Sequence, residues 1–148
     1  MKRLVALAIV GVAVSALTLS FAFVLYSRAS ECPSYAVSGS AGIGIVVVQE
    51  GTNWTATLAA TPRGLVPEST WAEISNSSDG TDLLGQTAWS ALTDADWARQ
   101  HALYDDRHPG VRFICGGDRL VIGVAQYPDG SALRIWDERT IIADAVLT

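Results

Sequence analysis

The chain is poor in the side chains that most often carry chemistry. Its 148 residues include two histidines and two cysteines, and the only lysine is Lys2. No H-E-x-x-H zinc motif, no G-x-S-x-G nucleophile motif and no phosphate-binding glycine loop occurs. The sequence therefore lacks the usual signatures of zinc proteases, serine hydrolases and nucleotide-binding enzymes, and it indicates no cofactor.

Basic residues are also scarce beyond the N-terminus. Residues 31–148 hold all 15 acidic residues and seven arginines, which leaves a formal charge of −8. Such a surface repels the phosphates of nucleic acids, so nucleic-acid binding is not expected. Arginine as the only basic residue type of this part indicates a GC-rich bacterial genome.

The N-terminus, by contrast, carries a long hydrophobic run. Residues 4–26 are 23 consecutive positions without a charge, and a membrane-spanning helix needs about 20. Lys2 and Arg3 precede the run, so the positive-inside bias holds the N-terminus in the cytoplasm and directs the remainder outside. A single-pass protein of the cell membrane is the first interpretation. The alternative is secretion after cleavage near Ala29, because Ser27 and Ala29 are small residues at the −3 and −1 positions.

Both interpretations divide the chain in the same way. Residues 1–29 are the membrane anchor or signal peptide, 30–42 a linker rich in serine, glycine and alanine, and 43–148 the extracytoplasmic domain. Outside the cytoplasm an even pair of cysteines favours a disulfide. The sequence therefore predicts a bond between Cys32 and Cys115.

Residues 43–148 predict a small α+β domain of about six mostly antiparallel strands, with one or two helices packed on one face. The β-branched run 43–49 predicts a central strand covered on both faces, and 54–61 its hairpin partner. Segment 69–75 suits a strand or a short helix. Helices are expected over 82–92 and 93–106, and Thr93 and Asp96 suit the start of the second one. A meander is expected over 111–115, 119–127, 131–138 and 141–148.

Two surfaces are candidates for function. Arg134 and Trp136 share the face of the predicted strand 131–138 opposite Leu133 and Ile135, and Tyr127 on a neighbouring strand is expected to join them. Tryptophan, tyrosine and arginine together are typical of protein-interaction hot spots.

His101, Asp105 and His108 stand at i, i+4 and i+7 and would share one face of a continuous helix. That set suits a divalent metal, although His108 precedes Pro109, which disfavours helical geometry at His108.

The sequence thus supports two functional hypotheses. The first is a non-enzymatic binding domain of the bacterial envelope, with an envelope protein as its partner and Arg134, Trp136 and Tyr127 at its contact surface. The alternative is a small metal-dependent hydrolase that uses His101, Asp105 and His108.

Overall fold

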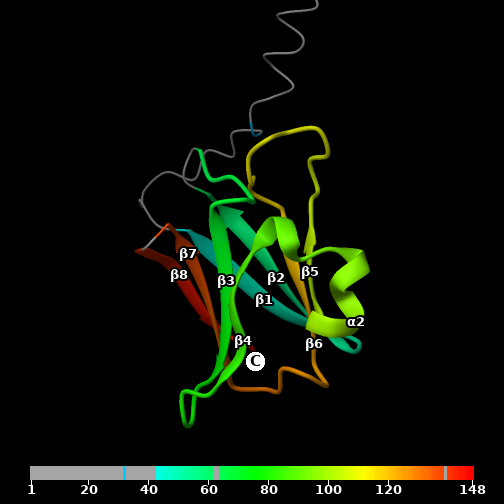
Figure 1. The fold of residues 1–148 in the computed structure, drawn as a ribbon, viewed down its shortest axis with the longest axis vertical. Helices are drawn as coiled ribbons and strands as arrows, with labels where there is room; N and C mark the ends of the chain where they lie inside the picture. Colours follow the sequence, from blue (N-terminus) through cyan, green and yellow to red (C-terminus); the bar gives the residue numbers. More distant parts are fainter. Residues whose placement is uncertain (1–31, 33–42, 62–63, 139) are drawn as a thin grey trace, which may run out of the picture. The chain divides into compact units, whose positions relative to one another are not determined.

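A computed structural model of the chain describes residues 32, 43–61, 64–138 and 140–148 (Figure 1). The chain divides into two units, Met1–Glu31 and Cys32–Thr148, and all described residues belong to the second unit. The anchor or leader predicted over 1–29 and the linker predicted over 30–42 lie outside the described residues, apart from Cys32. Within the described part of the chain, no helix has the length and apolar character that crossing a membrane requires.

The described residues form eight strands in two antiparallel sheets of four, with strand orders β1-β2-β6-β5 and β4-β3-β7-β8. Four links, β1–β2, β3–β4, β5–β6 and β7–β8, join antiparallel neighbours within a sheet. The three remaining links, between β2 and β3, β4 and β5, and β6 and β7, cross between the sheets. The strands are β1 (Gly44–Glu50), β2 (Asn53–Ala60), β3 (Thr70–Asn76), β4 (Asp82–Ala88), β5 (Ala102–Asp105), β6 (Arg119–Gly123), β7 (Ser131–Asp137) and β8 (Thr140–Val146).

The two sheets share one hydrophobic core. Successive side chains of a strand point to opposite faces, so one face of each sheet can be apolar while the other meets solvent. Trp54, Ala56 and Leu58 alternate in this way along β2, and Leu133 and Ile135 do so along β7; all five are at most 2% exposed. The core therefore lies between the two sheets, and the outer strands β1 and β8 are in contact with each other.

The helical content of the domain is much lower than the sequence predicts. The predicted helix 82–92 is instead strand β4 followed by the short 3-10 helix η1 (Trp89–Ala91), because β4 pairs with β3. The predicted helix 93–106 is reduced to the 3-10 helix η2 (Asp94–Asp96) and the four-residue helix α2 (Trp97–Gln100). His101 ends α2 in the left-handed conformation with φ of 48°, and β5 begins at the next residue. The described domain is mostly antiparallel sheet, with eight strands where about six were predicted and one short α-helix, so the predicted helical content is too high.

Two strand predictions also need correction. Strand β1 is an edge strand and not a central one, and Val46 and Val48 on its outer face are 53% and 50% exposed. Residues 111–115 form no strand; they belong to the loop between β5 and β6. The hairpin of 43–49 with 54–61 is confirmed, and Gly51 at φ +63° supplies the left-handed backbone of its turn. Segment 69–75 is strand β3.

Candidate functional site

The outer face of the second sheet carries the first candidate site. On β3 and β7, Ala72, Ile74, Leu133 and Ile135 point into the core, so the residues between them point outward. Cross-strand pairing sets Trp71 opposite Trp136, and the next row sets Glu73 opposite Arg134. On β8, Ile141 is paired with Trp136, Asp144 with Arg134, and Val146 with Ala132. We call these seven outward residues the tryptophan face: Trp71, Glu73, Arg134, Trp136, Ile141, Asp144 and Val146.

Charged and apolar groups are arranged in rows across this face. Arg134 Nη1 donates to Glu73 Oε1 at 3.0 Å, and the Glu73 side chain is only 13% exposed. Ile141 and Val146 are 45% and 49% exposed, at the edge strand of the sheet. The Nε1 atom of Trp136 is shielded from solvent and has no hydrogen-bond partner among the described residues. The prediction that Arg134 and Trp136 share a face is confirmed by this register.

Tyr127 is not part of the tryptophan face, which corrects the sequence-based expectation. It follows β6, which belongs to the other sheet, and it is 1% exposed. Its hydroxyl donates to the carbonyl of Gln100, and its own carbonyl accepts from Trp54 Nε1 at 2.8 Å. Tyr127 is therefore a core residue that anchors the link between β6 and β7.

The predicted metal ligands His101, Asp105 and His108 do not come together. The intervening chain is strand β5, and an extended strand rises about 3.3 Å per residue, so His101 and Asp105 stand roughly 13 Å apart along it. His101 packs against Gly123, whereas Asp105 pairs with Arg107 at 3.4 Å. The helix on which the metal prediction depended is absent, and the prediction fails with it.

The second candidate site is a buried carboxylate that the sequence did not single out. Asp118, at the end of the loop between β5 and β6, has 0% exposure. Its Oδ1 accepts from Arg107 N at 3.0 Å and lies 2.9 Å from His108 Nδ1. Its Oδ2 accepts from Tyr104 Oη and Cys115 N, both at 2.8 Å. A carboxylate has about four acceptor positions, so these four partners satisfy Asp118 completely.

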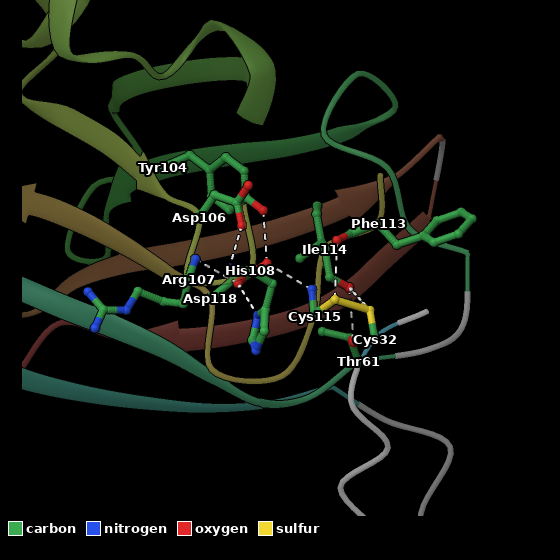
Figure 2. The surroundings of a disulfide bond; sticks show 10 residues. All are labelled: Cys32, Thr61, Tyr104, Asp106, Arg107, His108, Phe113, Ile114, Cys115 and Asp118. Atoms are coloured by element: carbon green, nitrogen blue, oxygen red, sulfur yellow. Dashed lines mark hydrogen bonds and ion pairs between the residues drawn. A yellow bond between two sulfur atoms is a disulfide. The ribbon is translucent and has the colours of Figure 1, made fainter. Parts of the chain in front are cut away.

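Asp118 fastens this loop beside a disulfide (Figure 2). The predicted bond between Cys32 and Cys115 is confirmed, with an S–S distance of 2.08 Å. Cys115 is fully buried and Cys32 is partly exposed. Next to the sulfurs, the carbonyl of Ile114 accepts from Thr61 Oγ1 at 3.2 Å. The disulfide and the carboxylate thus hold the same loop from two sides.

Tyr104, which bonds to Asp118, has a shifted pKa. Burial and the adjacent Asp118 carboxylate, which accepts the Tyr104 proton in a hydrogen bond, raise the pKa of Tyr104 well above its usual value of 10. The folded protein therefore keeps this proton at pH values where the unfolded chain releases it. The stabilisation is fully present below about pH 10 and is lost as the pH rises further.

The substitution Tyr104→Phe tests this linkage. It removes one hydrogen bond to a buried charge, so the free energy of unfolding should fall by about 2 kcal/mol at pH 7. Above pH 10 the wild type should lose stability more steeply than the variant, by about 1.4 kcal/mol per pH unit. Urea unfolding between pH 7 and 11 measures both effects. The matched control is Tyr127→Phe, which also removes a buried hydroxyl with a raised pKa, but one that bonds to the Gln100 carbonyl and not to a carboxylate. Its loss of stability at pH 7 should therefore be smaller than that of Tyr104→Phe. Equal stability of Tyr104→Phe and wild type at pH 7 would show that the hydrogen bond from Tyr104 to Asp118 does not stabilise the domain.

No protein-family model matches this chain, and comparison with curated proteins and with solved structures gave no significant match.

Proposed function

We propose that this chain is a non-enzymatic binding domain of the bacterial envelope, and that it contacts an envelope protein through the tryptophan face. The proposal includes a location outside the cytoplasm, with residues 4–26 as membrane anchor or leader. The disulfide supports that location, because such bonds persist in oxidising compartments. The acidic charge of residues 31–148 argues against a nucleic-acid partner.

The observation that carries the proposal is the placement of Trp71 and Trp136 in one row with the exposed Ile141. Tryptophan and arginine are enriched among the residues that dominate binding energy, and exposed aliphatic side chains beside them extend the apolar contact. The arginine is already oriented, because Arg134 pairs with the largely buried Glu73. A partner would therefore bind an arginine that is already held in place within an apolar surface, and the Arg134 side chain would lose little conformational entropy.

Trp136 is central to this surface. Cross-strand pairing places it between Trp71 on β3 and Ile141 on β8. Its indole N–H is shielded from solvent, so the side chain offers a partner its apolar ring surface and not a hydrogen-bond donor. Because tryptophan is enriched among residues that dominate binding energy, binding to the tryptophan face should depend on Trp136 more than on its neighbours.

Site-specific photo-cross-linking in the native membrane tests the proposal. A photoreactive phenylalanine analogue at Asp144, on the tryptophan face, should yield an adduct of one defined mass. The same analogue at Val48, on the outer face of the other sheet, is the matched control and should yield none, although Val48 is also exposed.

Trp136→Ala then tests which residue holds the partner. Loss of a hot-spot side chain costs about 2 kcal/mol or more, so the Asp144 adduct should fall at least roughly 30-fold in affinity-limited conditions. Tryptophan fluorescence of the variant establishes that the domain remains folded. Equal adducts from Asp144 and Val48, or an Asp144 adduct that Trp136→Ala leaves unchanged, would refute the tryptophan face as the contact surface.

A further inference from the structure

Three potential metal ligands meet beside the disulfide, and a fourth is bonded to one of them. A ring nitrogen of His108, Cys115 Sγ and a carboxylate oxygen of Asp118 all lie within 4.8 Å of one another. Cys32 Sγ joins them because it is bonded to Cys115 Sγ (Figure 2). In this oxidised state the two sulfurs bond to each other and offer no thiolate. The same four residues would present two thiolates, an imidazole and a carboxylate if the disulfide were reduced.

We propose that reduction of the Cys32–Cys115 disulfide converts this cluster into a zinc site with Cys32, Cys115, His108 and Asp118 as its four ligands. Zinc is bound tetrahedrally by thiolate sulfur at about 2.3 Å and by imidazole nitrogen or carboxylate oxygen at about 2.0–2.2 Å. Ligand atoms around such an ion are about 3.3–3.8 Å apart, so the present spread of up to 4.8 Å among the atoms of His108, Cys115 and Asp118 would close by about 1 Å, and Cys32 Sγ would move toward His108 and Asp118 once its bond to Cys115 is broken. The loop that carries His108 and Cys115 has no strand pairing along residues 111–115 to resist this change.

The reaction balances with a protein dithiol as the reductant. One dithiol transfers two electrons and two protons, the Cys32–Cys115 bond breaks, and the reductant becomes a disulfide. Zinc then displaces the two thiol protons, since only thiolates bind the metal. The first attack falls on Cys32, which is partly exposed, whereas Cys115 is fully buried.

The net charge of the buried cluster favours replacement of the disulfide bond by a bound zinc ion. In the oxidised state the cluster holds the single negative charge of Asp118, at 0% exposure. Zinc with two thiolates and this carboxylate carries the same net charge of −1, so metal binding adds no uncompensated charge to the interior. Zinc would take the position on Asp118 Oδ1 that the His108 ring now occupies, and Oδ1 keeps its bond from Arg107 N. Asp118 Oδ2 keeps its bonds from Tyr104 and Cys115 N, which are the outer contacts that orient a metal-binding carboxylate.

Metal loading of the full chain in detergent tests this proposal. The oxidised and the phosphine-reduced protein are each given one equivalent of Zn²⁺ or Co²⁺ without oxygen and then freed of unbound ion. The reduced protein should retain about one equivalent of metal, and its Co²⁺ form should show thiolate-to-metal charge transfer with the intense absorption of tetrahedral cobalt. The oxidised protein should retain less than about a tenth of an equivalent.

His108→Ala separates this site from adventitious binding by two thiols. The variant keeps both cysteines and should bind zinc at least tenfold more weakly in competition with a chromogenic chelator. His101→Ala is the matched control, because His101 lies outside the cluster, and it should bind zinc like the wild type. Retention of wild-type affinity in His108→Ala overturns the proposal.

Failure of the reduced chain to hold zinc overturns the proposal as well, whether or not that chain is folded. If reduction alone unfolds the domain, zinc should restore the native tryptophan fluorescence, because binding to the folded state stabilises it. The tryptophan face is on the other sheet from β5 and β6, so either result leaves the proposed function independently testable.

Discussion

Replacing Asp118 by asparagine is expected to lower the free energy of unfolding by about 3–5 kcal/mol, the usual cost of breaking a buried charged network. An amide has one oxygen where the carboxylate has two, so its NH₂ group must face one pair of donors. The hydroxyl of Tyr104 and the ring of His108 can change from donor to acceptor. The backbone N–H groups of Arg107 and Cys115 cannot, and in either orientation one of them is left buried and unpaired.

Urea unfolding of the full chain, followed by tryptophan fluorescence, measures this loss. All five tryptophans lie between residues 54 and 136, so the signal reports on the domain alone. Asp129→Asn is the matched control, because Asp129 is exposed and its substitution should change stability by no more than about 0.5 kcal/mol. If Asp118→Asn came within about 1 kcal/mol of the wild type, the cluster would not be the anchor of the loop.

The sequence predicts strands well where one face of a strand is buried and the other is not. Strand β7 is an example, since Leu133 and Ile135 are buried and Arg134 and Trp136 between them are not. The same alternation placed Arg134 and Trp136 on one face. It could not show that Trp71 lies opposite Trp136, because that pairing joins positions 65 residues apart.

The predicted helices fail because tertiary pairing overrides local spacing. Residues of β4 fit a helical repeat, but the turn before it returns the chain alongside β3, and pairing of Ile74 with Leu84 fixes an extended backbone. Strand β5 is similar, since Ala102 pairs with Ile122 and is buried there. The signal in the sequence was the turn at 76–81 between two apolar segments, which is typical of a hairpin.

The Asp118 cluster was beyond sequence reasoning for a different reason. Two of its four donors are backbone N–H groups, which every residue except proline has, so no residue type marks them. The side chains of Tyr104 and His108 precede Asp118 by 14 and 10 residues, in no known motif spacing. The disulfide could be predicted, because only two cysteines are present and the compartment expected from the N-terminal hydrophobic run favours their oxidation.

Removing the disulfide is the second change that should lower the stability of the domain strongly. The bond joins residues 83 positions apart, and closing such a loop in the unfolded chain corresponds to about 4 kcal/mol of stability in the chain-entropy model. Cys32→Ala should therefore lower the free energy of unfolding by about 4 kcal/mol, measured by urea unfolding with a chelator present. The chelator matters, because zinc binding to the remaining Cys115 thiol would mask part of the loss.

Comparison of the single and double variants separates the stability contributed by the disulfide bond from the stability contributed by the packing of the two cysteine side chains. Cys32→Ala alone already breaks the bond, so adding Cys115→Ala should cost only the small cavity left by one buried sulfur, about 1 kcal/mol. The losses of stability in the two single variants, Cys32→Ala and Cys115→Ala, then add up to far more than the loss in the double variant, as expected for residues that act as one unit. Two independent losses of about 4 kcal/mol each would show instead that Cys32 and Cys115 stabilise the domain separately, and the disulfide would not be the link that holds residue 32 to the β5–β6 loop.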